Sequence, residues 1–134
     1  LYLLNKINGS IISKTPIHSS FKPIISGDQL FLITKKNLLV CLDLKSGEII
    51  YSLDIELEIA QLLDSKKKPI NIKNFYLSNK NILIFLNNSY IVSFTTLGKI
   101  KEIKKLPAKI GSLPIFINNS IMYLSKKNKL IIAN

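Results

Sequence analysis

The sequence contains no tryptophan, one cysteine and one histidine. A single cysteine, Cys41, excludes a disulfide within the chain, and with His18 as the only histidine no Cys/His metal cluster can be built from it. Motifs typical of nucleotide binding or of serine hydrolases are also missing. We therefore expect a non-catalytic chain without cofactor or metal, with His18 in a surface loop and Cys41 as a small buried hydrophobe.

Arginine is absent as well, so all nineteen basic residues are lysine, against eight acidic residues. Without the guanidinium fork that reads guanine edges, sequence-specific recognition of nucleic acid is not expected, although lysine still attracts polyanions. The net charge of +11 has two explanations, a lysine-rich coding bias and a selected basic surface. Composition alone leaves both open.

No apolar run reaches the roughly 18 residues that a membrane-spanning helix needs. The 134 residues, 47% of them hydrophobic, have the size and apolarity of one folded domain. The chain begins at Leu1 inside a strand-like pattern and without a signal-like segment. We expect it to be cut from a longer parent protein whose leader is not visible.

A repeat of about forty residues runs through the sequence. A shift of 38 residues lays segment 39–50 on segment 1–12, with Gly47 on Gly9 and Asp43 on Asn5. A shift of 51 lays the same segment on 90–101, with Gly47 on Gly98 but with Phe94 at the Asp43 position. A shift of 91 carries 23–43 onto 114–134, including the triplet Lys-Lys-Asn. This spacing is typical of the blades of a β-propeller.

Each repeat divides into four short apolar runs separated by turn residues. The runs are nearly continuous rather than alternating, which predicts strands covered on both faces. The sequence therefore predicts an all-β fold, a partial β-propeller of about three four-stranded antiparallel blades in a single domain, 1–134. Its parts are a blade end (1–15), a blade (20–55), a connection (56–70), a blade (71–106) and a truncated blade (112–134).

The connection is longer than its counterparts and has a helix-forming composition. The spacing of Leu57, Ala60 and Leu63 predicts a short helix with these residues on one face. Asp54 and the two glutamates that follow would share a face if the strand continued, as a cation site requires. We favour an acidic strand end or helix start over a cation site, because such clusters are common on surfaces.

The segment 41–54 resembles the repeat of the PQQ-like β-propeller family, whose pattern is roughly Ala-x-Asp-x-x-Thr-Gly-x-x-x-Trp. The matching positions are Leu42, Asp43, Ser46, Gly47 and Tyr51; the first repeat matches less well, with Asn5 and Asn8 at the Asp and Thr positions and Ser13 at the Trp position. The resemblance implies that Asp43 and Gly47 build the fold. It also implies that Tyr51, at the family's Trp position, is buried against a neighbouring blade.

The resemblance implies two kinds of function. In quinoprotein dehydrogenases the propeller holds pyrroloquinoline quinone and calcium, using a vicinal disulfide and a stacking Trp that this chain lacks. BamB-like members are non-catalytic periplasmic scaffolds in outer-membrane β-barrel assembly. We expect the second kind, a scaffold that binds protein partners in the periplasm or at the outer membrane, within a propeller of 7–8 blades completed by the same parent chain. The alternatives are a dehydrogenase fragment and a generic ligand-binding or sensor propeller.

The expected blade topology sorts the turns onto two faces, and lysines are unequally shared between them. One face would carry Lys6, Lys45 and Lys80 near Asp28 and Asp43. The other would form a basic surface for an acidic protein partner or anionic head groups. Its residues are Lys35, Lys36, Lys66, Lys67, Lys68, Lys126 and Lys127, with Lys105 and Lys109 nearby.

Overall fold

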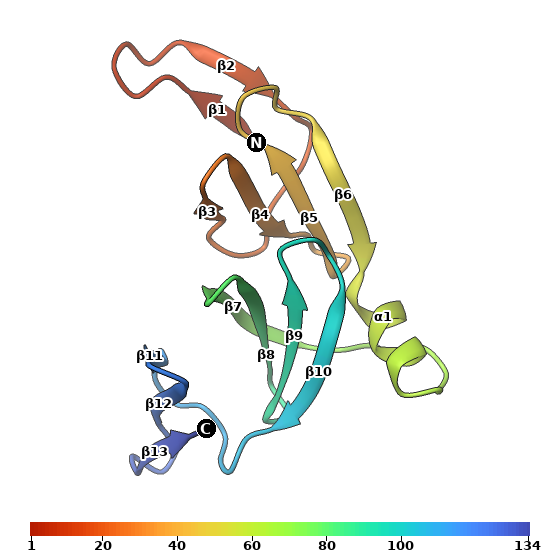
Figure 1. Cartoon of the computed structure of the whole chain (residues 1–134), viewed down its shortest axis with the longest axis vertical. Coiled ribbons are helices and arrows are strands. Elements are labelled where there is room, and N and C mark those ends of the chain that lie inside the picture. The colour runs from red at the N-terminus through yellow and green to blue at the C-terminus, as the bar shows by residue number, and fades with distance from the viewer. The chain divides into compact units, whose positions relative to one another are not determined.

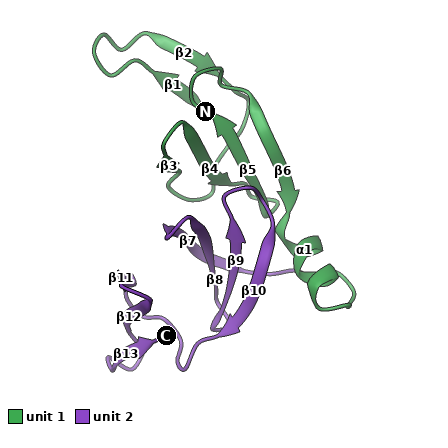
Figure 2. Ribbon diagram, in the orientation of Figure 1, with its two compact units in different colours: residues 1–68 green, residues 69–134 purple.

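The computed structural model describes all of residues 1–134, as strands β1 to β13 and one helix, α1 (Figure 1). The strands form four antiparallel sheets, in each of which neighbours in sequence are neighbours in space. The chain divides into two compact units, unit 1 (residues 1–68) and unit 2 (residues 69–134), drawn in different colours in Figure 2. The division falls in the connection between two of the sequence repeats.

Unit 1 holds a hairpin, a four-stranded sheet and the helix. The hairpin is β1 (Tyr2–Leu4) and β2 (Ile11–Lys14). The sheet is β3 (Ile24–Ser26), β4 (Gln29–Ile33), β5 (Leu38–Asp43) and β6 (Ile49–Asp54), followed by α1 (Ile55–Leu62). Leu1 and Leu3 of the hairpin pack on a buried cluster of Leu30, Leu32, Val40 and Leu42, so the two sheets share one core.

Unit 2 holds a four-stranded and a three-stranded sheet. The first is β7 (Ile72–Ser78), β8 (Asn81–Leu86), β9 (Tyr90–Thr95) and β10 (Ile100–Lys105). The second is β11 (Ile115–Ile117), β12 (Ser120–Leu124) and β13 (Leu130–Ala133). Phe85 and Ile91 of the first sheet share a buried cluster with Tyr123 and Ala133 of the second. Each unit is therefore built by stacking one sheet on the next.

The central strands are apolar on both faces, as their sequence predicted. Residues 30–33 of β4 and 39–42 of β5 are all buried, whereas the outer strand β6 is largely half-buried or exposed. A continuous apolar run suits a strand only when other protein covers both of its faces. The same contrast separates β8 and β9 from the lysine-bearing outer strand β10.

The turns keep their backbone conformation from repeat to repeat even where the residue changes. Gly27 (φ 58°) corresponds to Asn118 (φ 53°), and Asn37 (φ 57°) corresponds to Asn128 (φ 56°), each pair 91 residues apart. Glycine and asparagine are the residues that tolerate positive φ most readily. The corresponding turns of the two repeats therefore have the same backbone conformation, with glycine or asparagine at the position of positive φ.

An unpaired bulge residue also recurs, in the last strand of three sheets. Ile12, Ile50 and Lys101 are each skipped in the pairing with the preceding strand. Their spacings, 38 and 51, equal the shifts that align the sequence repeats. The repeat seen in the sequence is therefore reproduced in the strand register.

Helix α1 lies within the predicted connection, but its buried face is not the predicted one. Ile55 and Ala60 are buried, whereas Leu57 and Leu63 are exposed. Ala60 is the one residue of the predicted face that is buried. The helix begins at Ile55, directly after β6, and the Asp54 side chain caps it by accepting a hydrogen bond from the backbone N–H of Leu57 at 3.1 Å. Asp54 is thus a cap, with Glu56 and Glu58 in the first turn, as expected of an acidic helix start.

Candidate functional site

The turn between β5 and β6 is held by hydrogen bonds to its own side chains. Asp43 Oδ1 accepts from the backbone N–H groups of Lys45 and Ser46, both at 2.8 Å, and Ser46 Oγ accepts from Glu48 N–H at 3.2 Å. The backbone amide of Gly47 closes the turn on the Asp43 carbonyl at 2.8 Å. These residues are occupied in making the turn, and the geometry gives them no role toward a ligand.

The equivalent turn of the first repeat uses amides instead. Asn5 Oδ1 accepts from Ile7 N–H at 2.8 Å and Asn8 Oδ1 accepts from Ser10 N–H at 3.0 Å, while Gly9 closes on the Asn5 carbonyl. In the third repeat the sequence alignment placed Phe94 at the Asp position. The turn there is instead made by Thr95, one residue later, whose hydroxyl accepts from Lys99 N–H at 3.2 Å. Threonine hydroxyls form such side-chain-to-turn hydrogen bonds too, although more weakly than Asp or Asn, and this tendency is the signal in the sequence for Thr95.

Gly47 also lies where the hairpin comes closest to the four-stranded sheet of unit 1. Thr15 Oγ1 donates to the Gly47 carbonyl at 3.3 Å, and a Cβ on Gly47 would lie 2.4 Å from Ser13 Oγ. Glycine suits this position for two reasons: the turn requires a positive φ, which is 73° at Gly47, and the close contact with Ser13 leaves no room for a Cβ. The repeat's glycine is therefore part of the packing between the two sheets.

Replacing Asp43 is expected to change how unit 1 responds to acid. Hydrogen bonds from the Ser46 and Lys45 backbone lower the pKa of the Asp43 carboxyl. A carboxyl with a lowered folded-state pKa adds stability above its unfolded-state pKa, and this is lost as the pH falls through the folded-state value. Urea unfolding at about pH 7 and about pH 3 should therefore show a smaller acid loss for Asp43→Asn than for the parent chain.

The matched control for this change is Glu48→Gln, which removes one negative charge at the same turn. Asp43→Asn keeps a side-chain oxygen acceptor, as Asn5 does in the first repeat, so its stability at neutral pH should stay close to that of the parent. Asp43→Ala lacks the acceptor and should be less stable at both pH values. Equal acid sensitivity of the parent and Asp43→Asn would contradict the assignment.

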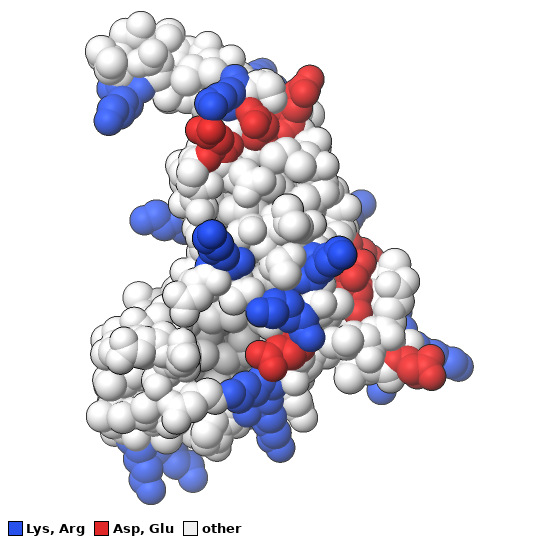
Figure 3. Space-filling view, in the orientation of Figure 1, with Lys and Arg blue, Asp and Glu red and all other residues white.

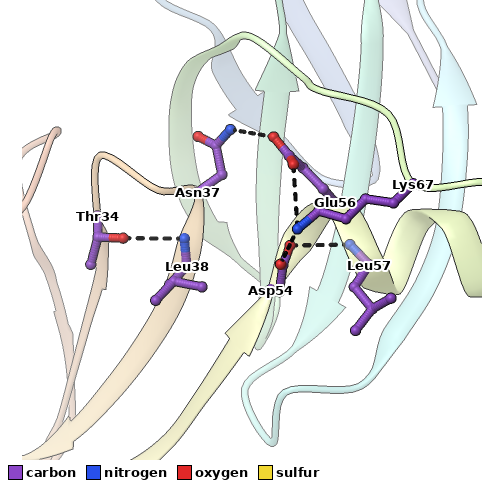
Figure 4. Close-up of polar contacts among 7 residues, drawn as sticks. All are labelled: Thr34, Asn37, Leu38, Asp54, Glu56, Leu57 and Lys67. Atoms are coloured by element: carbon purple, nitrogen blue, oxygen red, sulfur yellow. Dashed lines mark hydrogen bonds and ion pairs between the residues drawn. The ribbon is translucent and has the colours of Figure 1, made fainter.

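One lysine predicted on the basic surface of unit 1, Lys67, points toward the carboxylates of Asp54 and Glu56 (Figure 4). Lys67 Nζ lies 2.5 Å from Asp54 Oδ2 and 3.7 Å from Glu56 Oε2, and Asn37 Nδ2 donates to Glu56 Oε1 at 2.9 Å. The hydrogen bond with Lys67 lowers the pKa of Asp54. Lys67 is thus paired with carboxylates and its charge is largely compensated.

The remaining lysines of that predicted surface in unit 1 are exposed: Lys35 and Lys36 in the β4–β5 turn, and Lys66 and Lys68 after the helix. At the opposite ends of the strands, Lys45 pairs with Asp28 at 2.7 Å. This pair is solvent-exposed, so its contribution to stability is small. In unit 1 positive and negative groups are therefore mixed.

In unit 2 three of the predicted lysines lie together with Lys129, which was not predicted. Exposed Lys109 of the β10–β11 connection and Lys126, Lys127 and Lys129 of the β12–β13 turn line a cavity of about 460 Å³, with Ala108, Ser125 and Ile131 completing its walls. Nearby, Lys73 Nζ donates to the Ile110 carbonyl at 2.5 Å. Burial, and then the charge of Lys126, lower the pKa of Lys73. We call Lys109, Lys126, Lys127 and Lys129 the lysine cluster.

The net charge of the chain is concentrated in unit 2. Residues 69–134 contain ten lysines and one carboxylate, Glu102, whereas residues 1–68 contain nine lysines and seven carboxylates. In the space-filling view, red carboxylates gather over two parts of unit 1, near the β5–β6 turn and near α1 (Figure 3). This asymmetry depends on where the units divide, which is a property of the three-dimensional structure.

The side chains with the greatest potential for catalysis or ligand binding are Cys41, Tyr51 and His18, and their environments give no sign of such a role. Cys41 is buried and free, and burial raises the pKa of its thiol to about 11, with Asp43 as a second cause. Tyr51 is half-buried opposite Cys41, and burial raises the pKa of its hydroxyl. His18 is exposed, in an irregular segment. The structure has no group of three or more His, Cys, Asp or Glu side chains placed to hold a metal ion, and α1 is too short to cross a membrane.

Comparison with models of known protein families gave no match, and comparison with curated protein sequences gave none either. Solved structures do match. BamB from Moraxella catarrhalis matches 92% of this chain with a TM-score of 0.67 at 13% identity, and the computationally designed Ika8 protein matches 93% with a TM-score of 0.62 at 12% identity. Quinohemoprotein alcohol dehydrogenase ADHIIG from Pseudomonas putida HK5 matches 83% with a TM-score of 0.54 at 11% identity.

These likenesses establish the fold. The chain covers 34% of the BamB chain, 36% of Ika8 and 17% of the dehydrogenase. It therefore spans about a third of the length of the first two proteins. Together with the four sheets described above, the matches confirm the predicted all-β, partial β-propeller fold. The sheets are its blades.

Proposed function

We propose that the chain is part of a non-catalytic β-propeller scaffold that binds an acidic protein partner through the lysine cluster of unit 2. The observation that supports this most directly is the ratio of ten lysines to one carboxylate in residues 69–134. A surface with so few compensating carboxylates has a positive potential that attracts and orients negatively charged partners. Lys35 and Lys36 add exposed charge in unit 1.

A scaffold role resembling that of the BamB-like proteins is the finer part of this proposal. Its support is the match to BamB, which covers nearly the whole chain. The proposal places the protein in the periplasm, at the outer membrane. Fractionation of cells that carry the full-length protein, followed by immunodetection, tests this placement, and recovery in the cytoplasmic fraction would reject it.

Reversing charge in the lysine cluster is expected to weaken binding of an acidic peptide. The variant Lys126→Glu/Lys127→Glu should bind a labelled Glu/Asp-rich peptide about tenfold or more weakly than the parent chain at moderate salt. The reason is that the positive charges that attract the peptide and orient it on the surface are lost. Fluorescence anisotropy measures the affinity.

The matched control is Lys80→Glu/Lys99→Glu, which makes the same charge change in unit 2 at the β7–β8 and β9–β10 turns. Equal weakening by the control would show that only net charge matters and would reject a specific surface. Anionic vesicles containing phosphatidylserine form a second arm. Binding to the vesicles but not to the peptide would replace the protein partner with a lipid surface.

A quinoprotein dehydrogenase is the second candidate, and the observation in its favour is the match to quinohemoprotein alcohol dehydrogenases. In that case the residues that hold the quinone would have to come largely from outside this chain, since Cys41 is its only cysteine and it has no tryptophan. Quinone-stimulated reduction of a dye by the full-length protein would support this candidate. A full-length protein that is inactive with added quinone and calcium would favour the scaffold.

A further inference from the structure

Strand β7 contains a β-bulge that the first strands of the other blades, β3 and β11, lack. Lys73 is skipped in the pairing of β7 with β8, whereas Ile72 and Asn74 on either side of it are paired. Strands β3 and β11 pair with their neighbours without interruption. Because those strands form their sheets without a bulge, the fold does not require one in β7. Bulges re-aim side chains and are frequent next to functional sites.

The bulge brings neighbouring side chains of β7 to one cavity. In a regular strand Lys73 and Asn74 would point to opposite faces of the sheet. Here both residues, together with Tyr76, line a cavity of about 210 Å³. Asn74 Oδ1 accepts a hydrogen bond from the backbone N–H of Phe75 at 2.8 Å, directly after the bulge. Three side chains from one short stretch of β7 therefore line the same space.

The other wall of this cavity, residues 110–114, is held firmly on the neighbouring sheet. The backbone N–H groups of Gly111 and Ser112 donate to the Leu124 carbonyl at 2.8 and 3.1 Å, and Ser112 Oγ accepts from Leu124 N–H at 2.9 Å. A Cβ on Gly111 would lie 2.6 Å from the Ser125 carbonyl oxygen, so this close approach requires glycine. A wall fixed in this way reduces the ordering that binding would otherwise cost.

The charge at this cavity is positive. Lys73 Nζ donates to the neutral Ile110 carbonyl, and Glu102, the only side-chain carboxylate of unit 2, is not among the lining residues. The pKa of Lys73 is lowered by burial and, as the second cause, by the charge of Lys126. An anionic group beside Lys73 would offset both causes, because an opposite charge favours the ammonium form. The cavity therefore favours a negatively charged ligand.

The rest of the lining is mostly apolar, and the cavity is small. The rings of Tyr76 and Phe85 meet edge to face with their centroids 5.4 Å apart, and further apolar lining comes from Ile110, Leu113 and Pro114. At about 30 Å³ for each water-sized group, 210 Å³ holds about seven non-hydrogen atoms. Apolar and aromatic walls with a few polar groups are typical of small-molecule sites. A fitting ligand has one anionic end and a short hydrocarbon chain.

We propose that the cavity between β7 and residues 110–114 binds a small organic carboxylate with a short hydrocarbon chain, similar in size to pentanoate. Lys73 holds the carboxylate through a charge-assisted hydrogen bond, and the rings of Tyr76 and Phe85 contact the chain. The β7 bulge is the feature that places Lys73 at the cavity. This site uses Lys73 rather than the lysine cluster, so it does not depend on the scaffold function proposed above.

Titration of the full-length protein with pentanoate, followed through its backbone amide signals by nuclear magnetic resonance, tests the proposal. We expect saturable shifts at residues 73–76 and 110–114. Pentanol, which has the same chain without the charge, should bind about tenfold or more weakly, because it forms no charge-assisted hydrogen bond with Lys73. Lys73→Gln should weaken pentanoate binding to a similar degree. The control Lys99→Gln removes an exposed lysine of the same unit and should leave binding unchanged.

Four outcomes would overturn the proposal: no saturable shifts, equal binding of pentanol and pentanoate, equal binding by Lys73→Gln and Lys99→Gln, or shifts confined to the lysine cluster. The second would show that charge has no role in the cavity, and the fourth would indicate unspecific attraction of anions. The pentanol comparison uses the unaltered protein, so it decides the question even if Lys73→Gln does not fold. Failure here leaves the acidic-peptide test of Lys126 and Lys127 unaffected.

Discussion

Truncating Phe85 to alanine is expected to cost unit 2 about 3–5 kcal/mol of unfolding free energy, the range for deleting a buried aromatic side chain. Phe85 is buried in the cluster shared by the two sheets of unit 2. Its ring centroid lies 5.4 Å from that of Tyr76, edge to face, and 6.4 Å from that of Phe116. The substitution removes these ring contacts and leaves a cavity lined by residues from both sheets.

Urea unfolding followed by circular dichroism measures this loss, and amide exchange in β8 and β12 locates it in unit 2. Phe85→Leu should lose less, because it keeps much of the volume. The control is Leu97→Ala at an exposed turn position, which should change stability by less than about 0.5 kcal/mol. A loss below about 1 kcal/mol for Phe85→Ala would show that the two sheets of unit 2 are not held together by this cluster.

Replacing Gly47 with alanine is expected to destabilise unit 1 by about 2–5 kcal/mol, the sum of about 1–2 kcal/mol for an alanine at positive φ and about 1–3 kcal/mol for steric overlap. The new Cβ would lie 2.4 Å from Ser13 Oγ and 2.6 Å from Ser13 Cβ. Serine is too short to move both atoms away without shifting β2. The hairpin and the four-stranded sheet would therefore have to separate locally.

Gly9→Ala is the matched control, because Gly9 has nearly the same φ, 70°, and no atom within 4 Å of the added Cβ. It should lose only about 1–2 kcal/mol, the cost of positive φ alone. Ser13→Gly removes the overlapping side chain, so adding Gly47→Ala to that variant should cost no more than Gly9→Ala does. Equal losses for Gly47→Ala and Gly9→Ala in the parent chain would contradict the close approach.

The turn chemistry and the central strands were accessible from sequence because they depend on local rules. Asp43 and Gly47 specify a turn by side-chain acceptor and positive φ, and β4 and β5 are apolar runs of strand length. The same local rules misjudged α1: the spacing of Leu57, Ala60 and Leu63 described an apolar stripe, but Leu57 and Leu63 are exposed, and the buried residues are Ile55 and Ala60. Which side of a short helix is buried depends on the elements that pack against it, and the spacing of apolar residues within the helix does not determine this.

Charge was harder to predict than fold. Lys67 had been grouped with free lysines, yet it pairs with Asp54 and Glu56, which a helix and a turn bring back to it. The lysine cluster joins Lys109 to lysines of a turn seventeen or more positions later, and the packing of β12 on the β10–β11 connection brings them together. Such groupings depend on tertiary contacts, and residue spacing carries little information about them.

The bulge shared by Ile12, Ile50 and Lys101 bears on how a chain of similar repeats avoids aggregation. Repeats with alike strands can exchange partners during folding or join edge to edge between molecules, and the risk grows with every copy. A bulge interrupts the hydrogen-bonding row and increases the local twist, so two such outer strands cannot align over their full length. Because the bulge recurs in the last strand of these repeats, an additional repeat does not add a regular free edge on which fibrils could form.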